Sequence, residues 1–240
     1  MPLRLEPLRD RKLYRLVKAA AELRMSRGDM LYRLGEEAPT AFLVRRGHVR
    51  LVLDGRGDER TVAVAGPREL FGEEAMIPGA RRPYTAVAGE RCVVSPLEGP
   101  AVRNVLRTSQ HTLTTYLEVK ERELQLLRDA NGGSRPTTRE RLAAVLLDLA
   151  ERLAAEEEGI HVPHWFTHRE LGDLAGAHRS TVTTTLNDWL YEGILEEAPK
   201  GFRIRRPDAL RREAGLPPSH AIPHPSWPRP ARRVRDRATD

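Results

Sequence analysis

Short apolar segments separated by glycine make up the first hundred residues of the chain. The separating glycines are Gly28, Gly35, Gly47, Gly55, Gly57, Gly66, Gly72 and Gly79. The clearest alternation of apolar and polar positions lies at 41–53, where Val49, Leu51 and Leu53 share one face. A half-buried antiparallel strand has this period of two, and close turns between short strands are typical of β-barrels and rolls. The pattern therefore predicts a β-roll over residues 1–100.

The pattern becomes helical after Pro96. Residues 101–130 contain no glycine or proline and are rich in leucine, arginine and glutamate, which predicts one long helix. In heptad notation, one seam position holds Leu106, Leu113, Lys120 and Leu127, and the other holds Gln110, Leu117 and Leu124. We expect the five leucines of this stripe to form the interface of a homodimer, as in a two-helix coiled coil. Packing of the helix on its own domain would produce a similar pattern.

A glycine-rich break at 131–137 follows this helix and predicts a hinge. A second helix is expected from about Thr138 to Glu157, because apolar residues recur there at helical spacing. These residues are Leu142, Val145, Leu146, Leu149 and Leu153. The C-terminal domain is therefore placed at 138–214. The tail at 215–240 is rich in proline and arginine, so we expect it to lack ordered structure, with added non-specific affinity for DNA as the alternative role.

A helix-turn-helix is predicted within the C-terminal domain. Its first helix begins with a capping box, in which Thr167 and Glu170 satisfy the backbone amides at the helix start. Small residues at 175–177 supply the turn. The second helix is expected from about Arg179 to Tyr191, with Val182, Leu186 and Leu190 on its inner face. Two helices joined by such a turn form the usual DNA-reading unit.

The exposed positions of this unit are the candidate DNA contacts. They are Thr167, His168, His178, Arg179, Ser180, Thr181, Thr183, Thr184 and Lys200. Arginine suits guanine or phosphate, and hydroxyls suit phosphates and thymine methyl groups. Exposed threonines lower helix propensity without adding to the core, which favours a contact role over mere solvation. Two short strands at 193–197 and 201–206 predict a wing with Lys200 at its tip.

Composition adds little to this picture. The chain has 240 residues, which suits two domains, and its net charge of +6 is compatible with binding DNA. However, residues 164–214 hold eight Lys and Arg against eight Asp and Glu, so charge does not identify the DNA-binding part. There is no apolar run long enough to cross a membrane, no signal peptide, and a single cysteine. We expect a cytoplasmic, nucleoid-associated protein without a membrane partner.

The order of these parts resembles the cyclic-AMP receptor protein and FNR family of bacterial regulators, and the match runs from about 23 to 210. The roll motif is Gly28-Asp29-Met30-Leu31-Tyr32-Arg33-Leu34-Gly35-Glu36, and the cassette motif is Phe71-Gly72-Glu73-Glu74-Ala75. The recognition-helix motif is Arg179-Ser180-Thr181-Val182-Thr183-Thr184-Thr185-Leu186. The resemblance implies an α+β fold, with a cyclic-nucleotide-binding-type β-roll, a dimerisation helix and a C-terminal winged helix-turn-helix. It also implies a dimeric transcription regulator that reads a palindromic site in double-stranded DNA.

The resemblance locates a ligand pocket that departs from the pattern of cyclic-AMP-binding members. Its candidate residues are Gly72, Glu73, Arg81, Arg82, Tyr84 and Thr85. Gly72, Glu73 and Thr85 match the family, but Tyr84 stands where an arginine holds the cyclic phosphate, and a tyrosine offers no bidentate cation. Arg81 or Arg82 would substitute only if the loop bulges.

The long helix also departs from those members, because residues 117–128 contain neither the Thr nor the Ser that contacts adenine. We therefore expect no dependence on cyclic AMP and no cofactor, and we interpret Gly72 and Glu73 as scaffold: a turn glycine, and a glutamate paired with Arg81 or Arg82. The alternative is a cyclic-AMP-dependent regulator with a variant cassette.

The sequence lacks the residues that an iron–sulfur cluster or a cupin-type metal site would need. A lone Cys92 cannot hold an iron–sulfur cluster and is expected to be a small buried residue. A cupin-type enzyme would need several histidines in the roll, which contains only His48. His48 and His161 are expected at the surface, and no histidine pair suggests haem. We predict no metal site, no catalytic residue and no enzymatic activity.

Whether the protein activates or represses transcription is not readable from its residues, and the family resemblance favours activation. RNA polymerase is then an expected partner. The candidate contacts are the acidic loop at 156–161 and the exposed surface of the roll. A solvated helix end is the alternative interpretation of that acidic run.

Overall fold

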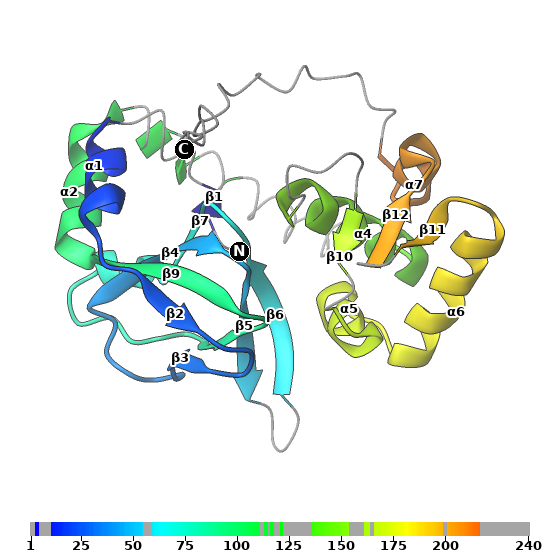
Figure 1. Cartoon of the computed structure of the whole chain (residues 1–240), viewed down its shortest axis with the longest axis horizontal. Helices are drawn as coiled ribbons and strands as arrows, with labels where there is room; N and C mark the ends of the chain where they lie inside the picture. The colour runs from blue at the N-terminus through cyan, green and yellow to red at the C-terminus, as the bar shows by residue number, and fades with distance from the viewer. Residues whose placement is uncertain are drawn as a thin grey trace, which may run out of the picture.

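The computed structural model describes residues 3–4, 11–54, 59–110, 113–114, 116–117, 121, 136–153, 161–163, 166–198 and 201–216. The N-terminal domain is a roll of two antiparallel sheets (Figure 1). The five-stranded sheet has the order β1 (Leu3–Arg4), β7 (Glu69–Phe71), β4 (Thr40–Arg46), β9 (Cys92–Glu98), β2 (Leu23–Met25). The four-stranded sheet has the order β3 (Met30–Tyr32), β8 (Thr85–Ala88), β5 (Val49–Asp54), β6 (Glu59–Ala65). The short 3-10 helix η1 (Glu73–Met76) follows β7.

The core of the roll lies between the two sheets and confirms the predicted strand pattern in most positions. Val49 and Leu51 of β5 are buried together with Phe42, Phe71 and aromatic or aliphatic neighbours. Leu53 was expected on the same buried face, but it is exposed. It pairs with Arg60, next to the last described pair of β5 and β6, Asp54 with Glu59.

The helix that follows the roll is shorter than predicted. Helix α2 (Gly99–Thr108) packs with helix α1 (Arg11–Ala19), and Ser109 after it has extended backbone angles of φ −124° and ψ 103°. The prediction of one uninterrupted helix over 101–130 is therefore wrong at Ser109. The Thr108 hydroxyl donates to the Asn104 carbonyl (2.8 Å) and Lys12 Nζ donates to the Thr108 carbonyl (3.2 Å), so these carbonyls are satisfied without a continuing helix.

Helical structure resumes directly after the break, since the Leu113 amide donates to the Ser109 carbonyl (3.0 Å). Residues 113–114, 116–117 and 121 are helical. Leu113 and Leu117 are exposed in the single chain, and Leu106 is half-buried. Leu124 and Leu127, with residues 131–135 of the expected hinge, lie outside the described residues.

The C-terminal domain combines four helices, within the described residues, with a small sheet. The helices are α4 (Thr138–Leu153), α5 (His168–Ala175), α6 (Arg179–Tyr191) and α7 (Pro207–Glu213). Leu142, Leu146 and Leu149 are buried, as predicted, in a core that includes Trp189. The last residue of the expected hinge, Thr137, forms a second capping box with Glu140, which fixes the start of α4.

The sheet of this domain has one strand more than predicted. Strands β11 (Leu195–Ala198) and β12 (Gly201–Ile204) form the expected wing hairpin, and β10 (His161–Pro163) pairs with the other edge of β12. His161, which was assigned to an acidic loop, is therefore the first residue of a strand. Buried Val162 holds this strand on the core, opposite Phe202. No helix in the described part of the chain is both long and apolar enough to cross a membrane.

Candidate DNA-reading surface and effector cavity

The helix-turn-helix forms from local signals that the structure confirms. The Glu170 amide donates to Thr167 Oγ1 (3.2 Å), and Glu170 Oε2 accepts from the Thr167 amide (2.7 Å), which completes the capping box of α5. The helix ends at Gly176, whose φ of +61° favours glycine. Gly172 allows the turn to pack closely on α5, because a Cβ there would lie 2.5 Å from the Ala177 carbonyl oxygen. Helix α6 therefore has a fixed position on α5.

Helix α6 presents the candidate contacts on its outer face. His178, Arg179, Ser180, Thr181 and Thr184 are exposed, whereas Val182, Thr185, Leu186 and Trp189 are buried. The helix lies at the edge of the molecule (Figure 1). The N-terminal half of α6 is thus accessible to base edges and phosphates. Lys200 at the expected wing tip lies outside the described residues.

Two candidate residues contact each other across the helix-turn-helix. His168 Nδ1 lies 2.8 Å from Thr183 Oγ1, and the Thr183 hydroxyl donates to the Arg179 carbonyl (3.0 Å). Since a hydroxyl has one proton, Nδ1 must carry the proton of the histidine–threonine bond, which leaves Nε2 as the acceptor of the neutral ring. Burial and the neighbouring Arg179 lower the pKa of His168. Sequence reasoning named both residues but not this pairing, which joins separate helices.

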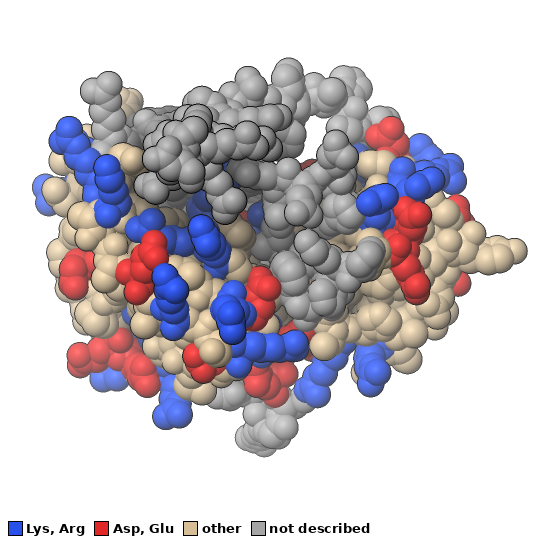
Figure 2. Space-filling model, viewed as in Figure 1, with Lys and Arg blue, Asp and Glu red and all other residues tan. Residues whose placement is uncertain are grey.

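The charge distribution agrees with the neutral composition of the C-terminal domain. Figure 2 shows Lys and Arg interspersed with Asp and Glu on the visible face, without one continuous basic patch. Arg203 and Arg205 beside the wing both lie near Glu196, at 3.7 and 3.3 Å. Charge on the visible face therefore does not single out a DNA-binding surface.

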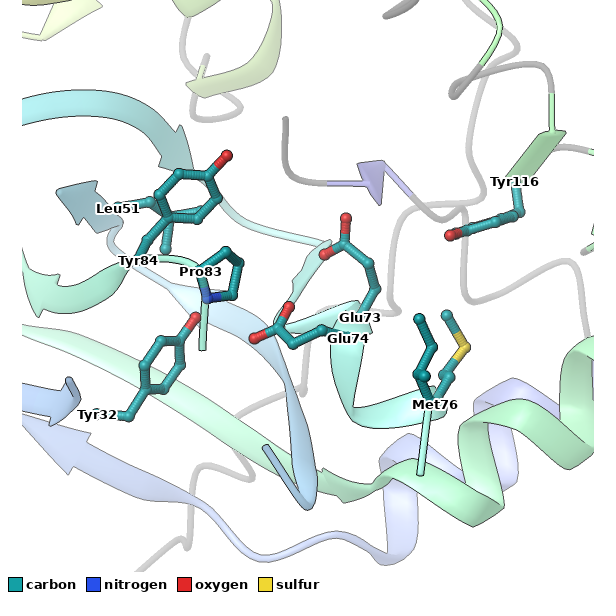
Figure 3. A pocket seen from close by; sticks show the side chains of 10 residues that line it. Tyr32, Leu51, Glu73, Glu74, Met76, Pro83, Tyr84 and Tyr116 are labelled. Atoms are coloured by element: carbon teal, nitrogen blue, oxygen red, sulfur yellow. The ribbon is translucent and has the colours of Figure 1, made fainter. Parts of the chain in front are cut away.

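The roll contains a cavity of about 270 Å³ beside the cassette turn (Figure 3). Its described lining residues are Tyr32, Leu51, Gly72, Glu73, Glu74, Met76, Ile77, Pro83, Tyr84 and Tyr116. Gly72 precedes η1 with a φ of +73°, a left-handed conformation that favours glycine. Gly72, Glu73 and Tyr84 of the candidate pocket residues thus line the cavity.

Arg82 lies beneath the cassette turn, and both of its terminal nitrogens are engaged with protein groups. Its Nη1 donates to Glu74 Oε1 (2.8 Å) and its Nη2 to the Thr40 carbonyl (2.5 Å). The guanidinium also lies 4.0 Å from the centre of the Tyr32 ring, and its side chain is only 2% exposed. Burial raises the pKa of Tyr32, so this ring stays neutral. Arg82 is therefore a structural cation held by its own domain.

The other pocket candidates are also engaged within the roll. Arg81 donates to the Gly35 carbonyl (2.8 Å), and buried Thr85 accepts the Leu34 amide (3.0 Å). Of the two arginines, Arg81 and Arg82, that were expected as partners of Glu73, Arg82 pairs instead with the neighbouring Glu74. The two glutamates are consecutive on η1, so their side chains leave the turn in different directions.

His48 and Cys92 are two further residues of the roll whose positions were predicted from the sequence. His48 was expected at the surface but is buried, with Nδ1 3.3 Å from Glu90 Oε1 and its ring 5.3 Å from that of Phe166. The C-terminal domain supplies Phe166, a covering that the sequence of the roll does not reveal. Cys92 is buried as predicted, and burial raises its pKa to about 11. Among the described residues, no group of three or more His, Cys, Asp or Glu is placed to hold a metal ion.

A roll with a cavity joined to a winged helix-turn-helix defines a class of DNA-binding transcription regulators rather than enzymes. Comparison with known proteins agrees with this class. Residues 22–109 match the cyclic nucleotide-binding domain model, and residues 140–213 match the Crp-like helix-turn-helix domain model.

The relatives give the family. The Cyclic AMP receptor protein of Thermus thermophilus is 31% identical over 182 residues, covering 74% of this chain and 81% of that protein. Transcriptional regulator LdrP of the same organism is 32% identical over 204 residues, covering 80% and 96%. A solved CRP-family transcriptional regulator from this organism is 30% identical, with a TM-score of 0.61 over 83% of this chain and 100% of that one. The chain belongs to the CRP/FNR family of DNA-binding transcription regulators.

Proposed function

We propose that this regulator acts as a homodimer on a palindromic DNA site and does not need cyclic AMP to bind it. The observation that carries the proposal is that Arg82 is already bound by groups of the roll. Its guanidinium is held by Glu74, the Thr40 carbonyl and the Tyr32 ring, so it is not available to a cyclic phosphate. Tyr84, which takes the place of the expected phosphate-binding arginine, brings only a hydroxyl to the cavity.

The electrostatics of the cavity support the same conclusion. Its described lining includes Glu73 and Glu74 and neither Lys nor Arg. Both carboxylates face the cavity region in Figure 3. Among the described lining residues, a phosphate anion placed there would meet these two carboxylates and no cationic side chain to replace its lost hydration.

The homodimer is supported by the exposed leucines after α2. Leu113 and Leu117 lie in the helical segment that follows Ser109, and both are exposed in the single chain. A second copy would bury them, together with Leu106, Leu124 and Leu127, in a two-helix seam. A symmetric dimer presents its two recognition helices to half-sites about one helical turn of DNA apart.

At each half-site we assign base or phosphate contacts to the exposed N-terminal half of α6. The assigned residues are His178, Arg179, Ser180, Thr181 and Thr184, with Thr167, His168 and Lys200 toward the phosphates. Thr183 is assigned a contact through its methyl group, since its hydroxyl is used by His168 and Arg179. Activation through contact with RNA polymerase is the expected output.

The second candidate is a cyclic-AMP-dependent regulator, which is favoured by the cavity beside Gly72 and by the relative named Cyclic AMP receptor protein. Selection of bound sequences from random duplex DNA at fixed salt, with and without cyclic AMP, separates the two. We expect one palindromic motif to be enriched equally in both conditions. Enrichment only with cyclic AMP would establish the second candidate.

Two matched variants sharpen this test. Tyr84→Arg restores the missing cation, and Tyr84→Phe removes only the hydroxyl. Calorimetric titration with cyclic AMP should give no binding for the wild type or Tyr84→Phe. A gain of binding in Tyr84→Arg alone would trace the lost affinity to this position. An Arg179→Ala variant serves as the control for DNA reading and should lose the motif in both conditions.

A further inference from the structure

The two domains are joined by contacts between the edge of the roll and the helix-turn-helix. Strand β6 is the last strand of the four-stranded sheet, so its outer backbone groups need partners. The Thr61 amide of this strand donates to Asp173 Oδ2 of α5 (3.1 Å). Val64, the residue before the end of β6, belongs to the same cluster of buried apolar side chains as Leu142 and Phe166. The roll therefore contributes to the core of the C-terminal domain.

A bidentate ion pair lies beside this apolar contact. Arg152 of α4 donates from Nε to Glu69 Oε1 (2.7 Å) and from Nη2 to Glu69 Oε2 (2.6 Å), and Nη2 also donates to the Val64 carbonyl. The Glu69 side chain is 1% exposed and that of Arg152 is 11% exposed. A carboxylate and a guanidinium in this geometry fix orientation as well as distance. They therefore define how α4 sits on the roll.

A third contact reaches the start of the DNA-reading unit. Arg50 of β5 lies 3.1 Å from Glu170 Oε1, while Glu170 Oε2 serves the capping box of α5. Arg169, the neighbour of Glu170, donates to the Glu59 carbonyl at 3.4 Å. The joined arrangement leaves the N-terminal half of α6 exposed. Docking of the domains is thus compatible with access of DNA to the recognition helix.

We propose that these contacts form a brace that holds the helix-turn-helix in its DNA-competent orientation. The brace consists of Arg50, Thr61, Glu69, Arg152, Glu170 and Asp173. Interfaces between domains of one chain are usually loose enough to permit relative motion. In a dimer, two loosely held helix-turn-helix units would rarely match both half-sites at once. The apparent affinity for the DNA then falls in proportion to the fraction of molecules in the binding-competent arrangement. The proposal rests on the proposed homodimer and its palindromic site, and it is independent of any requirement for cyclic AMP.

A disulfide across the brace tests whether the docked arrangement is the competent one. Thr61→Cys with Asp173→Cys places one thiol on β6 and one on α5, at the two residues whose backbone amide and carboxylate now meet, and the native Cys92 is buried. We expect the oxidised, cross-linked protein to bind the palindrome at least as tightly as the same protein after reduction. Loss of binding on oxidation, restored by reductant, would overturn the proposal, because the docked state would then be inhibitory. Either cysteine alone is the control.

A variant without the ion pair of Glu69 and Arg152 supplies the complementary measurement. Glu69→Gln with Arg152→Met removes both charges, so no unpaired charge stays buried, and the glutamine can still accept the Gly66 amide. We expect about tenfold weaker binding to the full palindrome and nearly unchanged binding to a single half-site, as a tenfold smaller competent fraction predicts. Equally weakened binding to the full palindrome and to the half-site would show damage to the helix-turn-helix itself and would refute the brace. Glu22→Gln, on an ion pair within the roll, is the matched control.

Discussion

Gly72 offers a quantitative test of the packing around the cassette turn. Its φ is +73°, and a Cβ added there would lie 2.7 Å from Arg82 Nη1. Arg82 cannot move away freely, because Glu74 and the Thr40 carbonyl hold it in a buried site. Gly72→Ala therefore adds a left-handed backbone penalty and also displaces a charged hydrogen bond.

Gly79 provides the matched control, since its φ is also +73° and nothing lies within 4 Å of its ideal Cβ. Gly79→Ala should cost only the backbone penalty, about 1–2 kcal/mol of unfolding free energy. For Gly72→Ala, loss of the charged hydrogen bond adds about 1.5–3 kcal/mol, giving a total of about 2.5–5 kcal/mol.

Urea unfolding followed by circular dichroism measures this difference in the roll. All three tryptophans follow residue 160, so fluorescence reports separately on the C-terminal part of the chain. Equal destabilisation by the two substitutions would refute the tight contact between Arg82 and the turn. Under the proposed function, the DNA affinity of the folded Gly72→Ala protein should match that of the wild type.

Three further predictions concern the helix-turn-helix and the dimer. Thr167→Ala removes the capping hydroxyl of α5 and should lower the free energy of unfolding by about 1 kcal/mol, measured by tryptophan fluorescence in urea. The pKa of His168 is lowered in the folded state, so the folded protein binds a proton less readily than the unfolded chain. Stability should therefore fall as the pH drops below the unfolded value of about 6.5 and level off below the folded pKa. His168→Gln should flatten this dependence in unfolding experiments at several pH values, and an unchanged slope would contradict the assignment. Leu117→Asp should shift the chain toward monomer in sedimentation velocity, whereas a dimer of unchanged strength would exclude this leucine from the interface.

Local signals made the helix-turn-helix predictable. Thr167 and Glu170 lie three residues apart and satisfy each other's backbone amides, so the start of α5 depends on a few neighbouring residues. The bounds of α6 were also predicted correctly, although its N-cap residue His178 makes no side-chain capping bond. Thr137 and Glu140 carry an equivalent signal at the start of α4, which could have been identified from their spacing but was assigned to the hinge.

The missed features depend on contacts between distant parts of the chain. Ser109 breaks the predicted long helix without a glycine or proline, and Lys12, almost a hundred residues earlier, satisfies the carbonyl of Thr108. Strand β10 has three residues, too few to show a period, and it depends on pairing with β12. His48 is buried by Phe166 of the other domain. None of these partners is visible from the residues around the feature.

Glu170 shows how one side chain combines a local and a distant role. Its Oε2 accepts the Thr167 amide within the capping box, and its Oε1 lies 3.1 Å from Arg50 on the roll. The first contact follows from the spacing of two neighbours, whereas the second joins strand β5 to the start of α5, far apart in the sequence. Because the carboxylate has two oxygens, the second contact leaves the capping bond intact. A motif that sets the start of the first helix of the helix-turn-helix can therefore also fix that helix to the roll, and this coupling becomes apparent only when the two domains are seen together.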